Sequence, residues 1–103
     1  MDLRVLWTNT ASEHLKDVFN YYKTTANLTV ARNIVKGIVQ KTTSLSSQPR
    51  KGQREPLLTD RQKEYRYIVE DNYKIINWVE LATVYIAAIF NTRQNPDKIR
   101  KAE

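Results

Sequence analysis

Hydrophobic and polar residues alternate with a period of two over one long stretch of the chain, residues 64–93. This stretch reads EYRYIVEDNYKIINWVELATVYIAAIFNTR and holds three short runs rich in Ile, Val, Tyr and Trp. β-Branched and aromatic side chains fit a pleated, half-buried surface. Asp71-Asn72 and Leu81-Ala82-Thr83, which separate the runs, are typical of tight turns. The pattern predicts a three-stranded antiparallel meander.

Alternation along these strands assigns each side chain to one face of the sheet. In the first strand, residues 65, 67 and 69 share one face and Arg66 lies on the other, and in the second strand Lys74 shares a face with Ile76 and Trp78. Two basic residues therefore lie inside strands, where a buried charge must be paired. Two interpretations stay open: the cations pair across the hairpin with residues 70 or 80, which are both Glu, or they serve a binding surface.

The first half of the chain has the spacing of one strand and two helices. The run from Leu3 to Trp7 predicts a strand, and the capping-box sequence from Thr10 to Glu13 predicts that a helix begins there. Apolar residues recur at helical spacing up to about residue 23, and again from about residue 29 to residue 45. Gly37, inside the second helix, predicts a close contact with the first helix.

Neither helix can bury its apolar stripe alone, so we expect a helix hairpin that packs on one face of the sheet. The order of strand, helix hairpin and three-strand meander predicts an α+β fold, and 103 residues form a single domain. A large-to-small change in its core should be destabilising. The residues expected to be largely buried are Ala11, Leu15, Phe19, Ile34, Ile38, Leu45, Ile75 and Ile86.

Residues 46–63 form a basic loop in this scheme, and residues 97–103 a flexible tail. Pro49, Gly52 and Pro56 argue against a regular element in the loop. Its positive charge lies beside the first strand of the meander, so the loop is either a solvated surface segment or a surface that binds a target or a nucleic acid. The basic residues concerned are Arg50, Lys51, Arg54, Arg61 and Lys63.

The composition narrows the function. Seventeen Lys and Arg against eleven Asp and Glu give a net charge of +6, which favours nucleic acids or acidic proteins as partners. The absence of cysteine excludes a disulfide framework and a thiolate metal site, and the single histidine, His14, argues against zinc catalysis. We expect His14 to be a surface or packing residue, and we expect neither a metal nor a cofactor.

No apolar run approaches the roughly 20 residues of a membrane span, so a cytoplasmic protein without a membrane partner is expected.

Several short motifs occur along the chain in a characteristic order. They are Ala11-x-x-x-Leu15, Leu45-x-x-x-Pro49-x-x-Gly52, Tyr65-Arg66, Asn72-Tyr73-Lys74-Ile75-Ile76 and Thr92-Arg93-Gln94-Asn95-Pro96. In the order and spacing of these motifs the chain resembles the RelE/ParE superfamily, the toxins of bacterial type II toxin–antitoxin (plasmid stabilisation) modules. The resemblance implies a compact sheet with two helices on one face and a cognate antitoxin that neutralises the toxin by wrapping it. Assembly as a homodimer or as a toxin–antitoxin hetero-oligomer stays open.

Function divides within that superfamily. RelE-like members cut messenger RNA on the ribosome without a metal, and Arg66, Lys74 and Arg93 occupy positions similar to their basic catalytic residues. Such members usually carry a Tyr or His near the end of the last strand or in the tail. Here Asn91 stands where a His is frequent, and neither Tyr nor His follows Tyr85. Because Asn cannot transfer a proton, general acid–base chemistry lacks an obvious residue.

ParE-like members resemble the nucleases in fold but lack that residue set and poison DNA gyrase instead. The departure at Asn91 favours this branch, in which the chain is a growth inhibitor and not an enzyme. The alternatives are a RelE-like, ribosome-dependent mRNA endonuclease, and a non-toxic partner that binds the antitoxin and regulates its own operon.

Overall fold

Alternating apolar residues in the second half of the chain form the three antiparallel strands that the sequence predicts. The computed structural model describes residues 2–60 and 62–93. In it β3 (Arg66–Glu70), β4 (Tyr73–Glu80) and β5 (Thr83–Asn91) are neighbours in one sheet. Each of the two turns between them holds a residue with positive φ, 54° at Asp71 and 55° at Leu81. The turns therefore lie where the sequence predicts them.

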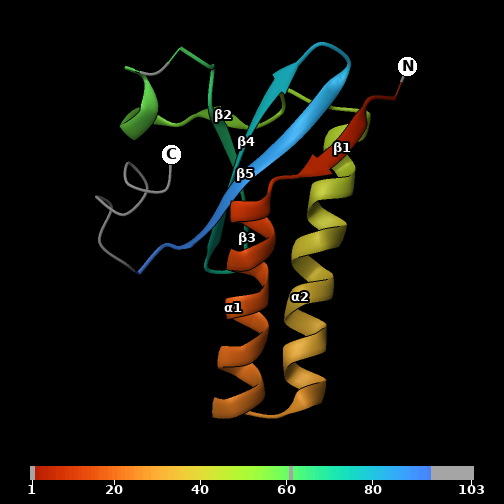
Figure 1. The fold of residues 1–103 in the computed structure, drawn as a ribbon, viewed down its shortest axis with the longest axis vertical. Helices are drawn as coiled ribbons and strands as arrows, with labels where there is room; N and C mark the ends of the chain where they lie inside the picture. The colour runs from red at the N-terminus through yellow and green to blue at the C-terminus, as the bar shows by residue number, and fades with distance from the viewer. Residues whose placement is uncertain (1, 61, 94–103) are drawn as a thin grey trace.

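Two further strands complete a five-stranded sheet of order β1-β5-β4-β3-β2. β1 (Arg4–Trp7) lies parallel to β5, and β2 (Gln53–Arg54) pairs antiparallel with β3. The helices α1 (Asn9–Thr25) and α2 (Leu28–Thr43) form a hairpin on one face of the sheet, called the helix face here (Figure 1). The predicted α+β fold, with its N-terminal strand, helix hairpin and meander, is confirmed.

Both helices begin slightly earlier than predicted. The N-cap of α1 is Thr8, whose hydroxyl oxygen accepts a hydrogen bond of 3.1 Å from the Ala11 N–H. The predicted cap at Thr10 is wrong, because Thr8 is the residue that leaves β1 in an extended conformation and can turn its side chain onto the first helical turn. Asn27 caps α2 in the same way, by accepting from the Val30 N–H at 2.9 Å.

Side chains on the helix face of the sheet form the larger core with the hairpin. Ala11, Ile38, Leu45, Ile75 and Ile86 are fully buried there, as expected. The other expected core residues, Leu15, Phe19 and Ile34, are only half-buried. Phe19 and Ile34 belong to the half of the hairpin near its connection, which projects past the end of the sheet (Figure 1), so the sheet covers that half less completely.

The basic loop is more regular than predicted. Gln53 and Arg54 form β2 because the outer edge of β3 offers backbone groups for pairing, and Pro56 opens a short 3₁₀ helix, η2 (Pro56–Leu58), at a position where its fixed φ is compatible with a helix start. Leu58 and Tyr65 are buried with Ile76 in a second, smaller core on the face away from the helices, called the far face here. The loop therefore does not only border the sheet, as expected, but also covers its far face.

Gly37 marks a close contact, but with a strand rather than with the first helix. A Cβ placed on Gly37 would lie 3.0 Å from Oε2 of Glu70, on β3. The expected helix–helix contact at this position is wrong, because α2 crosses the β3–β4 hairpin here.

Neither helix in residues 2–60 and 62–93 is both long and apolar enough to span a membrane.

We predict that Ile38→Ala lowers the free energy of unfolding by about 2–5 kcal/mol, since the side chain is fully buried between helix and sheet. Urea denaturation followed by circular dichroism measures this change. The matched control is Val39→Ala on the same helix, where the side chain is 36% exposed and the cost should stay near about 0.5 kcal/mol. Equal costs at the two positions would contradict the packing described.

Candidate target-binding surface

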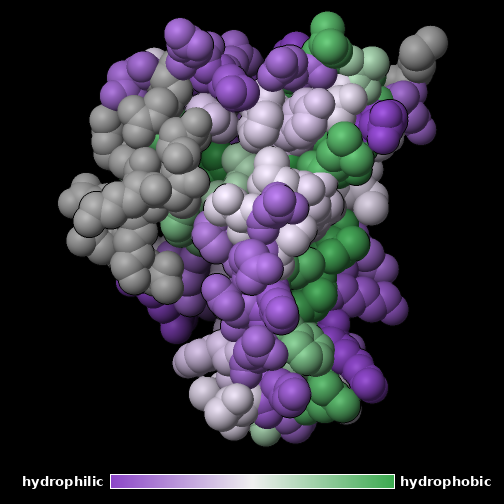
Figure 2. Space-filling view, in the orientation of Figure 1, coloured by the Kyte–Doolittle hydropathy of each residue, from purple (hydrophilic) through white to green (hydrophobic). Residues whose placement is uncertain are grey.

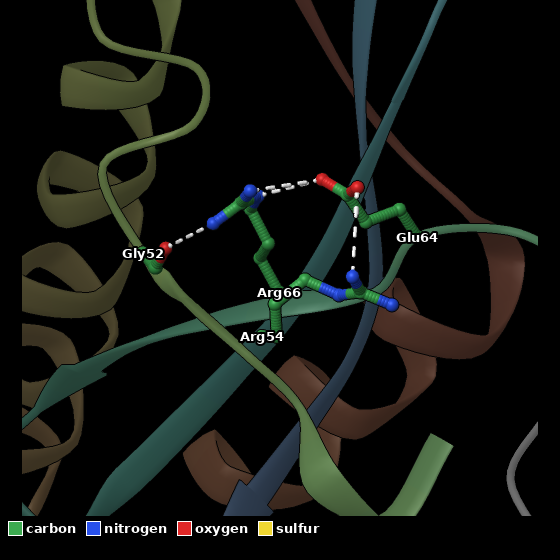
Figure 3. Close-up of polar contacts among 4 residues, drawn as sticks. All are labelled: Gly52, Arg54, Glu64 and Arg66. Carbon is green, nitrogen blue, oxygen red and sulfur yellow. Dashed lines mark hydrogen bonds and ion pairs between the residues drawn. The ribbon is translucent and has the colours of Figure 1, made fainter. Parts of the chain in front are cut away.

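Arg66 lies at the start of β3, on the helix face but beyond the end of the hairpin. Its Nε and Nη2 donate to Oε2 of Glu64 at 3.0 and 2.9 Å, and its Nη1 donates to the carbonyl oxygen of Gly52 at 2.8 Å (Figure 3). The guanidinium group is thus held in place by a carboxylate two residues earlier and by the backbone of the loop.

Lys74 lies on the opposite face of the sheet. Its Nζ is 2.7 Å from Oε2 of Glu55 and 4.1 Å from the centroid of the Tyr67 ring. The Glu55 side chain is fully buried, and the Glu55 N–H donates to the Tyr65 carbonyl at 2.9 Å. Lys74 therefore forms a buried ion pair that fastens the loop to the far face.

Arg66 and Lys74 do form ion pairs, but not with Glu70 or Glu80 as expected. Glu70 points toward α2, against Gly37, and Glu80 accepts a hydrogen bond of 3.2 Å from Nε1 of Trp78. The carboxylates that do pair with Arg66 and Lys74 come from the basic loop, which sequence periodicity could not place in space.

Arg93 follows β5 and is exposed. Its backbone N–H donates to Oδ1 of Asn91 at 2.9 Å, next to a Thr92 N–H that donates to the Asn72 carbonyl at 2.7 Å. Since Arg66 and Lys74 lie on opposite faces of the sheet, the three candidate catalytic residues do not converge on one point.

The cations of the basic loop are spread over several surroundings. Arg50 and Lys51 are exposed, Arg54 lies 3.9 Å from Glu64, and Lys63 lies 5.3 Å from the centroid of the Trp78 ring. Arg61 lies outside the residues that the structure describes. The described cations thus give a positive but discontinuous surface, interrupted by Glu64.

His14 reaches the end of the last strand from α1, a contact that the sequence did not predict because residues 14 and 89 are far apart along the chain. Its Nδ1 accepts a hydrogen bond of 3.1 Å from the Ile89 N–H, and its ring lies 5.4 Å from that of Phe90. Burial lowers the pKa of His14, while the nearby Asp17 opposes that shift. Helical spacing from Ala11 places residue 14 beside the apolar stripe of the helix, and this spacing indicates that His14 lies near the sheet. His14 is a packing residue, as expected, that also holds the backbone of β5.

These features define an α+β domain of the RelE/ParE type, with its strand cations engaged by carboxylates of the same chain. The family described as "ParE toxin of type II toxin-antitoxin system, parDE" matches residues 5–96. The chain therefore belongs to the ParE toxin family, and the resemblance seen in the sequence is confirmed.

A solved structure gives the same fold. A chain from the chromosomal ParDE toxin–antitoxin system of P. aeruginosa superposes with a TM-score of 0.74 at 18% sequence identity, over 86% of this chain and 95% of that one. Curated proteins gave no match to the sequence. At this identity the structural likeness concerns the fold.

We predict that Lys74→Met lowers the free energy of unfolding by about 3 kcal/mol, because it leaves the Glu55 carboxylate buried without a counter-charge. Chemical denaturation measures the change. The matched variant Glu55→Met/Lys74→Met removes both charges and should recover most of the loss, since apolar replacements of buried ion pairs are commonly neutral or stabilising. A single-variant cost below about 1 kcal/mol would instead be typical of a surface pair.

We also predict that His14 makes stability depend on pH. Its folded-state pKa lies below the unfolded value of 6.5, so the unfolded chain takes up the proton first as the pH falls. Stability is therefore fully present above pH 6.5 and decreases below it. His14→Asn retains an acceptor near the Ile89 N–H but does not titrate. Urea unfolding at several pH values should show a smaller loss between about pH 7 and pH 5 in this variant, and parallel curves would contradict the prediction.

Proposed function

We propose that the chain is a cytoplasmic growth inhibitor that acts on DNA gyrase and is neutralised by a cognate antitoxin. The observation that carries the choice of target is the separation of Arg66 and Lys74 on opposite faces of the sheet. A phosphoryl-transfer site needs donors aimed together at the oxygens where charge develops. A protein that poisons an enzyme by docking needs no such convergence.

The ion pairs of Arg66 and Lys74 also favour gyrase over messenger RNA as the target. A carboxylate oxygen lies 2.9 Å from Nη2 of Arg66 and another lies 2.7 Å from Nζ of Lys74. To reach Lys74, a phosphate would have to displace a carboxylate that is fully buried. The His14 Nδ1 is engaged by a backbone N–H, and so this nitrogen is not free to accept a proton from a ribose hydroxyl.

The surface of α2 supports an antitoxin partner. Leu28 and Val39 are 41% and 36% exposed, and their spacing places them on the same side of the helix, with Val35 between them. Figure 2 shows hydrophobic surface running along the helix hairpin. An apolar strip of this kind on a protein of charge +6 suits an amphipathic segment with acidic flanks. The P. aeruginosa relative comes from a ParDE toxin–antitoxin system.

The test is inducible expression in a bacterial host, with and without the antitoxin encoded beside the gene. We expect growth arrest with filamentation and DNA breaks, rescue by the antitoxin, and inhibition of supercoiling by purified gyrase. Messenger RNA should stay intact in a ribosome-containing extract. Arg93→Ala should retain toxicity, and its folding is not at issue because the side chain is exposed.

Two results would overturn the gyrase target. Codon-specific cleavage of messenger RNA that disappears in Arg93→Ala, where loss of one such donor costs on the order of a hundredfold to a thousandfold, would make the chain a RelE-like nuclease. Unchanged growth on expression without the antitoxin would indicate the non-toxic, autoregulatory partner instead.

A further inference from the structure

A small polar cavity lies where β3 and β4 meet the exit from the helix hairpin. Its volume is about 110 Å³. Glu64 and Arg66 line it, and Figure 3 shows the loop carbonyl and the carboxylate that hold the Arg66 guanidinium. The lining residues are Arg50, Glu64, Arg66, Asn77, Trp78 and Val79.

Asn77 supplies an unsatisfied acceptor in this wall. The residue is 1% exposed, and its Nδ2 donates to the Ile75 carbonyl at 3.0 Å, which fixes the orientation of the amide. Its Oδ1 has no hydrogen-bond partner among the described residues. A buried carbonyl oxygen without a donor is uncommon in native proteins. This atom is itself enclosed, so Asn77 contributes a polar side chain to the lining of the cavity and not an atom that a ligand contacts.

Arg66 supplies unused donors next to that acceptor. Arg66 and Asn77 are directly opposite in the β3–β4 register, so their side chains are neighbours on the same face. A guanidinium group has five N–H donors, and the contacts with Glu64 and Gly52 account for three of them. The cavity thus presents spare donors of a cation beside a polar side chain of the neighbouring strand.

The lining indicates the chemistry of the ligand. Two guanidinium groups against one carboxylate favour an anion. Glu64 already occupies one edge of Arg66 with a carboxylate, and its side chain is 47% exposed, so it can swing outward. The Trp78 ring offers no free face for a nucleobase, because Tyr85 stacks on it at 4.7 Å and Lys63 lies 5.3 Å from its centroid.

We propose that this cavity binds an acidic side chain of the antitoxin. The partner's carboxylate replaces Glu64 on Arg66 and accepts hydrogen bonds from the guanidinium group. A short carboxylate side chain suits a volume of about 110 Å³, whereas a nucleotide needs a larger pocket. The identity of the partner rests on the proposed function, but the carboxylate chemistry does not.

The experiment is a titration of the ¹⁵N-labelled protein with N-acetyl-aspartate methylamide, which carries both a carboxylate and N–H donors. The side-chain signals of Asn77 and of the Arg66 Nε–H should shift and saturate. Glu64→Gln should tighten binding by about tenfold, because it removes the resident competitor. Arg66→Lys should abolish saturation, because Lys lacks the planar fork of donors. The matched control Arg93→Lys, at an exposed site away from the cavity, should bind as the unchanged protein does.

Three outcomes would overturn the proposal. One is the absence of any shift in Glu64→Gln, whose backbone spectrum reports that it is folded. Another is inorganic phosphate saturating the same signals more tightly than the aspartate probe. The third is a complex with the antitoxin in which both signals keep their free positions. None of these measurements depends on toxicity, so they test the cavity independently of the gyrase target.

Discussion

The parallel pairing of β1 with β5 is the constraint on which the rest of the fold depends. Parallel neighbours cannot be joined by a tight turn, so the chain must cross the sheet between them. The helices α1 and α2 carry it to the far edge, and the meander returns strand by strand until β5 meets β1. Thr8 stands at the junction, since its N–H and its hydroxyl both donate to the Ile86 carbonyl while the hydroxyl caps α1. With the hairpin on one face, the basic loop is the segment that covers the other within residues 2–60 and 62–93.

Because the helix hairpin packs on one face of the sheet and the basic loop on the other, the cations of the strands have carboxylate partners from the loop. Neither α1 nor α2 covers the far face, and the loop that covers it carries the buried carboxylate of Glu55, which requires a counter-charge. Lys74 provides it at 2.7 Å. At the edge of the sheet, Arg54 and Arg66 are directly opposite in the ladder, a like-charge pair that Glu64 offsets by contacting both. These cations are therefore integral to how the loop is fastened.

Periodicity predicted the strands, both helices and most of the larger core, because those features depend on residues close in sequence. It misplaced what depends on contacts between distant segments. The cap at Thr8 follows from the proximity of β5, the edge pairing of Gln53 from the open side of β3, and the contact of Gly37 from the tilt of α2 over the β3–β4 hairpin. The candidate site was predicted less well. Alternation assigned Arg66 and Lys74 to faces within their own strands, but the opposite positions of the two cations and their partners Glu64 and Glu55 are known only from the structure.

The two ion pairs differ in one respect that decides what each cation can do. Glu55 is fully buried, so Lys74 cannot exchange its partner without opening the second core. Glu64 is 47% exposed and lies at the surface of the loop, so Arg66 can exchange its carboxylate for another at the cost of a largely solvated contact. Buried oxygens without a hydrogen-bond partner occur beside both cations, at Asn77 opposite Arg66 and at Glu55 beside Lys74. What separates the two ends of the sheet is therefore the exposure of the carboxylate. The charge of Arg66 is open to exchange at the surface, whereas the charge of Lys74 is enclosed with Glu55 and serves the fold.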